Sequence, residues 1–277
     1  MRIAGQAICI VAALALCLVA QLAVIGVLAH NRDQDTRYNS FRVELANATA
    51  PVGGLDKTRR LLADGTPMAI LAIPKLGLRE VVGEGTSPEA LKSGPGHRRD
   101  TVLPGQNGVS VLYGRRAAYG GPFEGISTLS VGDDIKVTTG QGVHGYRVTG
   151  VRRAGAPQPV ALAKGEGRLT LVTADGPLFL PSDVLRVDAK LTSQAYPTNG
   201  APPAMAVRDA EQQMSEDFSA IVPMVAWGLV LCVAAGGVVF LRQRAGRWHA
   251  WVVGVPLLGA LGLTVADQAA SLLPNLL

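Results

Sequence analysis

Three long stretches of the chain are apolar and almost uncharged, and they predict helices that cross a membrane. No charge interrupts residues 3–29 or 218–241, and the stretch 248–277 contains a single acidic residue, Asp267. A transmembrane helix needs about 20 predominantly apolar residues. We therefore expect membrane helices at 1–30, 218–241 and 248–277. The first should be an uncleaved anchor, because its apolar run exceeds the roughly 7–15 residues of a signal peptide's apolar region.

Between the first two apolar stretches, the pattern changes to short strands. Apolar and polar residues alternate with a period of two, and Gly, Pro and Asp separate the runs. Residues 185–191 show this best, with apolar side chains at odd positions and Arg186, Asp188 and Lys190 between them. Such runs predict a mainly β domain, closed or sandwich-like, over residues 68–192. The other predicted strands cover 68–73, 109–113, 134–138, 146–151 and 168–173.

The segments that flank this domain differ from it in composition. Residues 31–67 are polar and of mixed charge, and we interpret them as a stalk with a short helix at 56–64. Residues 193–217 begin rich in Pro, Ser and Ala, which disfavours helix and strand alike, and they form a linker to the second membrane helix. Within the domain, Ser-Pro at 87–88 is typical of a helix start and predicts a short helix that ends at Lys92.

The net charge of +5 reflects membrane topology and does not indicate nucleic-acid binding. Residues 31–218 contain 22 basic and 20 acidic residues, so this region is nearly neutral. The remaining basic residues flank the apolar stretches and are Arg2, Arg242, Arg244 and Arg247. Basic residues mark the cytoplasmic side of membrane helices. We therefore expect a cytoplasmic N-terminus, a cytoplasmic basic loop at 242–247 and an extracytoplasmic β domain in a multi-pass plasma-membrane protein.

Several motifs in the β domain resemble, in order, elements of the sortase family of cysteine transpeptidases. Residues 71–77 (Leu-Ala-Ile-Pro-Lys-Leu-Gly) look like the family's first strand, and residues 94–97 (Gly-Pro-Gly-His) look like a later turn. Residues 113–123 are similar to the segment that carries the catalytic histidine, and 169–173 resemble the strand before the nucleophilic cysteine. The resemblance covers 69–191 and is strongest to actinobacterial class E-like members. It implies a sortase-like closed β-barrel flanked by transmembrane α-helices.

The residues on which sortase chemistry depends are replaced in this chain. The resemblance places the family's cysteine at Ala174, its histidine at Arg115 and its arginine at Val184. A methyl group is no nucleophile, and a guanidinium keeps its proton near neutral pH, so neither does the work of the residue it replaces. The chain's cysteines all lie in the apolar stretches, where a thiol reaches no soluble substrate, at Cys9, Cys17 and Cys232. We therefore expect no catalytic residues of the sortase type.

Other polar side chains near these positions are assigned no catalytic role. The candidate groove residues are Tyr113, Asp175 and Arg186. We expect Arg115 to contact Asp175 and partly close the degenerate site, because a buried guanidinium needs an acceptor. His97 is expected to be structural, as part of its turn, and His144 to be solvated. The sequence has no metal-ligand spacing and no phosphate-binding loop, so we expect neither a metal nor a cofactor.

These observations favour binding over catalysis. We interpret the chain as a membrane-anchored, extracytoplasmic sortase-fold pseudoenzyme, a binding or scaffolding component in cell-envelope or surface-protein assembly. Besides the membrane, its expected partner is another envelope protein, a sorting-signal-like peptide or an active sortase, and not nucleic acid. One alternative is a degenerate sortase with residual hydrolase or transpeptidase activity through Ser182 or Thr173. A second is a sensor domain in a membrane transport or signalling complex.

Overall fold

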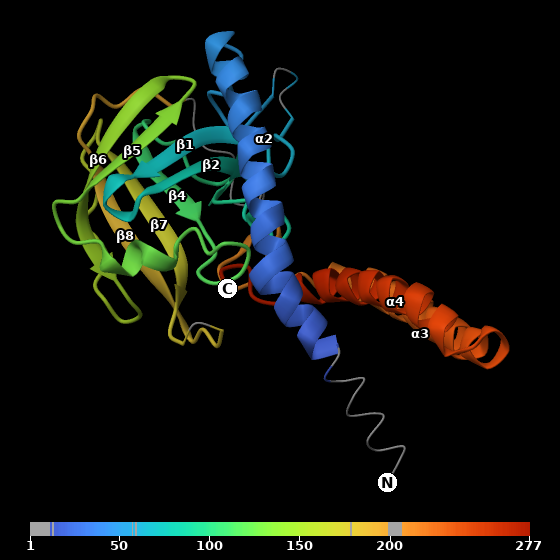
Figure 1. Ribbon diagram of the computed structural model, residues 1–277. Coiled ribbons are helices and arrows are strands. Elements are labelled where there is room, and N and C mark those ends of the chain that lie inside the picture. The colour runs from blue at the N-terminus through green and yellow to red at the C-terminus, as the bar shows by residue number, and fades with distance from the viewer. Residues whose placement is uncertain (1–11, 13, 57, 59, 178, 199–206) are drawn as a thin grey trace. The chain divides into compact units, whose positions relative to one another are not determined.

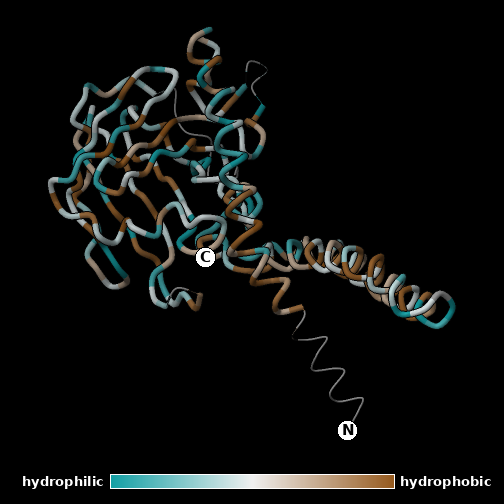
Figure 2. The backbone as a smooth tube through the Cα atoms, in the orientation of Figure 1, coloured by the Kyte–Doolittle hydropathy of each residue, from teal (hydrophilic) through white to brown (hydrophobic). Residues whose placement is uncertain are grey.

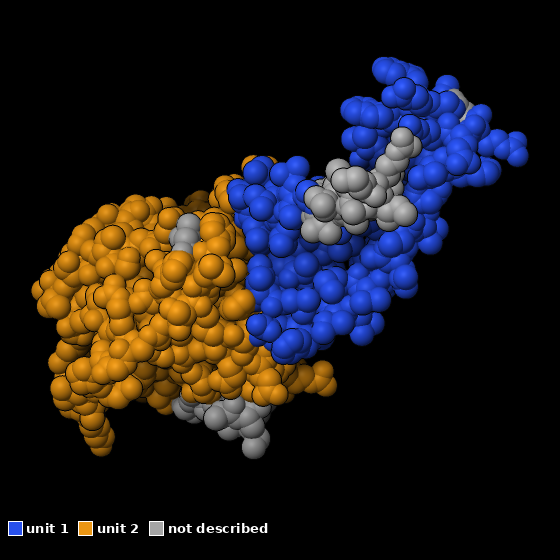
Figure 3. Space-filling model, turned by 90° about the horizontal axis from the view of Figure 1, so that it is seen from below, with its two compact units in different colours: residues 1–26, 216–273 blue, residues 27–215, 274–277 orange. Residues whose placement is uncertain are grey.

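The structure is a computed structural model, and the residues it describes form two compact units (Figure 3). The described residues are 12, 14–56, 58, 60–177, 179–198 and 207–277. The smaller unit comprises residues 1–26 and 216–273, and the larger comprises 27–215 and 274–277. The last four residues therefore belong to the larger unit although they follow a membrane-type helix.

Eight strands close into a barrel in the larger unit (Figure 1). Their order around the barrel is β1-β2-β3-β4-β7-β8-β6-β5, with β2 and β3 parallel, β4 and β7 parallel, and the other neighbours antiparallel. The predicted closed, mainly β fold is therefore confirmed. The strands are β1 (Pro67–Ile73), β2 (Leu78–Glu84), β3 (Gly96–His97), β4 (Gly108–Tyr113), β5 (Asp134–Thr139), β6 (Gly142–Arg152), β7 (Gly167–Asp175) and β8 (Asp183–Leu191).

The alternation along the strands fills the barrel with apolar side chains. On β8, Leu185, Val187 and Ala189 lie in the core, and Leu169 and Leu171 of β7 lie there with them. Residues between these positions face out of the barrel, because successive side chains of a strand point to opposite faces. Side chains on the outer face of β7 and β8 are therefore available to form a site outside the core.

Helix α2 (Gly26–Ala46) covers part of the barrel wall. Phe41 is fully buried in a cluster with Ile70 of β1 and Val81 of β2. Gln34 accepts a hydrogen bond from the Val81 amide at 2.7 Å. The region expected as a stalk thus begins with a helix that docks on the barrel. It also covers the outer face of β2, and this is why that strand shows no clean alternation and was not predicted.

Two short helices expected from the sequence differ in the structure. Residues 56–64 form no helix where they are described. The Asp56 carboxylate instead accepts hydrogen bonds from the amides of Thr58 (2.7 Å) and Arg60 (2.9 Å) and so stabilises a turn. The helix expected at 87–92 is a single 3-10 turn at Ala90–Lys92, whose N-cap is Glu89 and not Ser87. The Ser87 hydroxyl accepts a hydrogen bond from the Ala90 amide at 3.2 Å. Further 3-10 turns lie at Pro74–Leu76, Glu124–Thr128, Asp209–Glu211 and Phe218–Ala220.

Three helices in the described part of the chain are long and apolar enough to cross a membrane, at Leu14–Ala46, Phe218–Arg244 and Arg247–Ala270. Their apolar character is visible along α3 (Ile221–Ala245) and α4 (Arg247–Ala270) in Figure 2. The first of these helices includes a π-helical segment, Gln21–Ile25. Within the smaller unit, Gln21 Nε2 donates a hydrogen bond to Asp267 Oδ1 at 3.0 Å, so a polar contact joins the first helix to α4.

Candidate functional site

The positions that the resemblance assigns to the sortase cysteine and arginine lie opposite each other on neighbouring strands. Ala174 near the end of β7 pairs directly with Val184 near the start of β8. Both side chains lie outside the barrel core and are buried all the same, at 1% and 7% exposure. The preceding residue, Thr173, faces the other way, and its hydroxyl donates to Gly114 O at 2.8 Å.

An apolar cup surrounds this pair of residues. Its walls are Leu91, Tyr113, Val172, Ala174 and Val184, and one further side chain, Leu276, completes the cluster. Leu276 is fully buried. The outer face of the barrel at Ala174 and Val184 is therefore covered by a residue that lies far away in the sequence.

Residues Pro274–Leu277 are held in this place by their backbone as well as by side chains. The Arg116 amide donates to Leu276 O at 3.0 Å, and the Asn275 amide donates to Ser215 O at 2.9 Å. The Asn275 side-chain amide donates to Thr86 O at 2.9 Å and to Gln212 O at 2.8 Å. The sequence did not predict that this segment docks on the barrel, because an apolar run that follows a membrane helix has the same composition as a longer membrane helix.

Arg115, which the resemblance places at the sortase histidine, is fully buried. The chain reaches it through Gly114, where a Cβ would come within 2.4 Å of the Phe123 ring, so only glycine fits there. The Arg115 guanidinium donates to Pro88 O at 2.7 Å and lies 5.0 Å from the centre of the Tyr119 ring. In this position the guanidinium donates a hydrogen bond and packs against an aromatic ring, but it transfers no proton at neutral pH.

The predicted contact between Arg115 and Asp175 is wrong. Asp175 ends β7 and pairs with Arg153, at 2.9 Å, and with Arg116, at 3.9 Å. Arg115 turns inward beneath the 87–92 segment instead, because Pro88 O offers it a buried acceptor. The site is therefore closed by Leu276 and not by an ion pair between these two residues.

A second segment, Val207–Ser215, lies over the same face of the barrel. Met214 packs against the cup, and Gln213 accepts a hydrogen bond from Arg186. Glu211 is fully buried and accepts from Arg99 Nε at 3.1 Å. This part of the predicted linker is thus anchored to the barrel by a buried ion pair.

Tyr113 and Arg186, two of the candidate groove residues, lie near this second segment. The Tyr113 hydroxyl accepts from Arg98 Nη1 at 3.4 Å. Burial raises the pKa of Tyr113, so its hydroxyl stays protonated near neutral pH. Arg186 pairs across the strands with Val172, which belongs to the cup.

The two histidines considered from the sequence are both buried. His97 bonds to Glu84 Oε2 through Nδ1 at 2.9 Å and to Val102 O through Nε2 at 3.0 Å. The expectation that His144 is solvated is wrong, because it packs edge-on against Tyr196 and its Nε2 lies 3.0 Å from Thr139 Oγ1. Burial lowers the pKa of His144. Among the described residues, no group of three or more His, Cys, Asp or Glu side chains is arranged to hold a metal ion.

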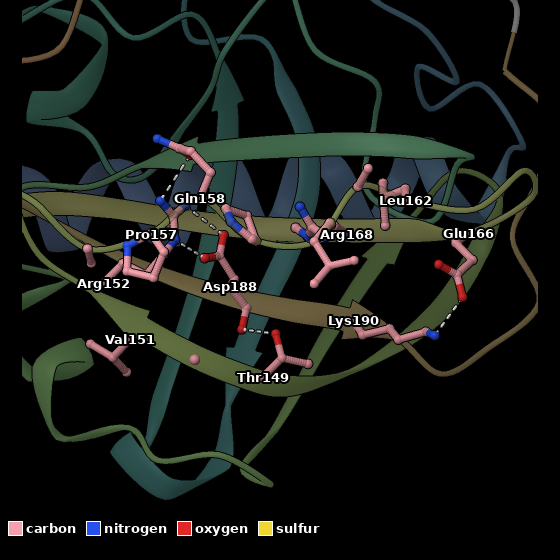
Figure 4. Close-up of a pocket in the computed structure, with 15 residues that line it drawn as sticks. Thr149, Val151, Arg152, Pro157, Gln158, Leu162, Glu166, Arg168, Asp188 and Lys190 are labelled. Carbon is pink, nitrogen blue, oxygen red and sulfur yellow. Dashed lines mark hydrogen bonds and ion pairs between the residues drawn. The ribbon is translucent and has the colours of Figure 1, made fainter.

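A separate cavity of about 600 Å³ lies over the outer faces of β6, β7 and β8 and is lined by the loop that joins β6 to β7 (Figure 4). Asp188 is buried in its wall and is bound by Arg152 and by the Thr170 hydroxyl, at 2.8 Å. Lys190 pairs with Glu166 at 2.6 Å. These two ion pairs are each neutral, and the remaining charged side chain of the lining, Arg168, donates a hydrogen bond to Val160 O.

Comparison with known proteins identifies the barrel. Residues 71–191 match the family model described as the sortase domain. The chain is 32% identical to sortase D of Bacillus subtilis over 84 residues, which are 30% of this chain and 41% of that protein. It therefore spans less than half the length of this relative.

Solved structures of sortases are also similar to the chain. A sortase D5 transpeptidase of Clostridium perfringens is 24% identical, with a TM-score of 0.48 and coverage of 58% of this chain and 99% of that one. Sortase E1 of Streptomyces coelicolor is 26% identical, with a TM-score of 0.41 and coverage of 48% and 92%. The match to the sortase domain model spans residues 71–191, the part of the chain that forms most of the barrel.

Proposed function

We propose that this protein is a membrane-anchored sortase-fold protein that binds and does not catalyse transpeptidation. The observation that carries the proposal is the apolar cup at Ala174 and Val184, which is filled by Leu276. Thiol acyl transfer needs a nucleophile, a base and an oxyanion donor in one accessible place. None of the three corresponding positions supplies such a group.

The role that fits is a binding or scaffolding component in cell-envelope or surface-protein assembly. The supporting facts are the sortase domain and the membrane-type helices. The basic residues between α3 and α4 support a cytoplasmic position for that loop, and with it an extracytoplasmic position for the barrel. An envelope protein, a sorting-signal-like peptide or an active sortase is the proposed partner of this multi-pass protein.

Residual activity through another hydroxyl is the competing function, and the geometry disfavours it. Thr173 is buried on the opposite face of β7, with its hydroxyl bound to Gly114 O. Ser182 is exposed, but both of the buried histidines described above are bonded elsewhere, to Glu84 and to Thr139. A serine without a base is a weak nucleophile.

The test is intact-protein mass spectrometry of the full chain in detergent after incubation with sorting-signal peptides. An active sortase serves as the positive control, and Ser182→Ala is the matched variant. We expect no acyl adduct on this chain. A covalent adduct would overturn the proposal, and its loss in Ser182→Ala would identify the nucleophile.

The binding role is tested by photo-crosslinking in native membranes. A crosslinking residue replaces Val160, which is 85% exposed beside the cavity of Figure 4, or Val131, which is 74% exposed on a turn before β5. We expect a discrete envelope-protein adduct from position 160 and none from position 131. Equal adducts from both positions would indicate collisions and not a binding face.

A further inference from the structure

We infer that the segment Pro274–Leu277 is a peptide ligand of the barrel, bound within the same chain. The binding site is the apolar cup at Ala174 and Val184, and the class of ligand is an apolar peptide with the sequence Asn-Leu-Leu. This inference rests on the proposed function, because it names the peptide that occupies the non-catalytic groove.

The first argument is the depth of burial. Asn275 and Leu276 are fully buried, and Leu277 is 3% exposed. Here Leu276 is inserted among Leu91, Tyr113 and the side chains of β7 and β8, as an anchor residue is inserted into a peptide-binding pocket.

The second argument is the way in which the backbone is recognised. The main chain of the segment is bonded by the Arg116 amide and by Ser215 O, and the carbonyls of Thr86 and Gln212 accept from the Asn275 side-chain amide. Each of these bonds would have to be replaced by water if the segment left. Main-chain bonds combined with a pocket for one side chain are the features by which proteins bind extended peptides.

The third argument is the chemistry of the cup itself. Ala174 and Val184 present only carbon atoms, so the cup repels a charged or strongly polar side chain and accepts leucine. The segment is tethered to α4 through Ser271–Leu273. A tethered ligand has an effective concentration in the millimolar range. A peptide from another protein must compete with it, and removal of the segment opens the cup.

The experiment uses a cysteine at the base of the cup as a reporter. The full chain, with its three native cysteines replaced by alanine, carries Ala174→Cys and is labelled in detergent with a soluble maleimide. We expect Cys labelling at position 174 to be slower by a factor on the order of 10 to 100 in the intact chain than in a chain ending at Leu273, as burial of one leucine would give.

Variants of Leu276 and a peptide added in trans sharpen the result. Leu276→Ala should speed the labelling, whereas Leu276→Met, which conserves volume, should leave it slow. The synthetic peptide of residues 271–277 should restore protection to the shortened chain, and the same peptide with aspartate at position 276 should not. A second reporter, Val137→Cys in the barrel core, must stay unlabelled in every variant that is scored.

Two outcomes would overturn the inference. In the first, position 174 of the intact chain is labelled as fast as a cysteine at the surface position Ser127. In the second, it stays protected in the shortened chain or in Leu276→Ala, which means that Met214 and its neighbours cover the cup without the segment. If the shortened chain fails the core control, Leu276→Ala in the intact chain decides. Neither outcome bears on whether the chain has a nucleophile. The proposed lack of catalysis is tested separately, by intact-mass measurement after incubation with sorting-signal peptides.

Discussion

The buried pair formed by His97 and Glu84 provides the sharpest test of how this barrel is stabilised. Both side chains are almost inaccessible to solvent, at 2% and 0%, and the Nδ1 to Oε2 distance is 2.9 Å. The two ring nitrogens of His97 face the Glu84 carboxyl group and the Val102 carbonyl, and with Glu84 ionised both are acceptors. This geometry favours an imidazolium at position 97.

The pKa of His97 follows from two opposing effects. Burial disfavours the imidazolium, but the attraction of Glu84 and the hydrogen bonds to Glu84 and Val102 outweigh it and raise the pKa above its usual value. At this distance, an ion pair is attracted by about 6 kcal/mol at an effective dielectric constant of about 20. Desolvation offsets much of that, yet removal of one partner leaves the other charge buried and costs about 3–5 kcal/mol.

We therefore expect His97→Gln to lower the free energy of unfolding by about 3 kcal/mol at pH 6. The stabilisation by His97 is fully present below the unfolded-state pKa of about 6.5 and is lost as the pH rises through the higher folded-state pKa. The difference between the two proteins should shrink above neutral pH. The double variant His97→Gln, Glu84→Gln should recover part of the loss, because no charge is then left buried.

Urea unfolding of the full chain in detergent, from pH 6 to 9, measures this effect. All five tyrosines lie outside the membrane-type segments of the smaller unit, and all three tryptophans lie within that unit. The tyrosine near-UV circular dichroism therefore follows the barrel, and tryptophan fluorescence follows the helices. Parallel stability curves for wild type and His97→Gln across this range would refute the buried imidazolium.

Three further predictions concern burial and orientation. Arg115→Ala should lower barrel stability by about 1–3 kcal/mol, because it leaves Pro88 O buried without its donor; an unchanged urea midpoint would show that the guanidinium is dispensable. Phe41→Ala should cost about 3–5 kcal/mol and make α2 accessible to limited proteolysis, and full protease resistance would contradict the docking of α2. A cysteine at Ser127 should react with an impermeant maleimide in intact cells, and one at Gln243 should not; the reverse pattern would invert the topology.

The strands that were predicted correctly are those with one face in the core and one face in solvent. β8 is the clearest, with its core leucines and valine separated by charged residues. β2 was missed because α2 covers its outer face, so its last four residues are all buried and no alternation remains. β3 has only two residues, which is too short for any periodicity to appear.

The sequence predicted which positions would form the candidate site, but it did not predict which residue covers them. The motif order located Ala174 and Val184, and the structure places them side by side on β7 and β8. Leu276 could not be assigned to them, because hydropathy measures a preference for leaving water and does not distinguish lipid from a protein cup. Arg115 was misjudged for a related reason, since its acceptor is the backbone carbonyl of Pro88, and a backbone group leaves no signature in the sequence.

The side chains at positions 174 and 184 are consistent with each other once Leu276 is in place. An arginine at position 184 would put a guanidinium into a cup lined by carbon atoms, with the large desolvation penalty of a buried charge. Val184 avoids that penalty and Ala174 leaves Leu276 room to pack, so both side chains keep the cup apolar. The apolar lining of the cup and its occupation by Leu276 are therefore linked features of this barrel.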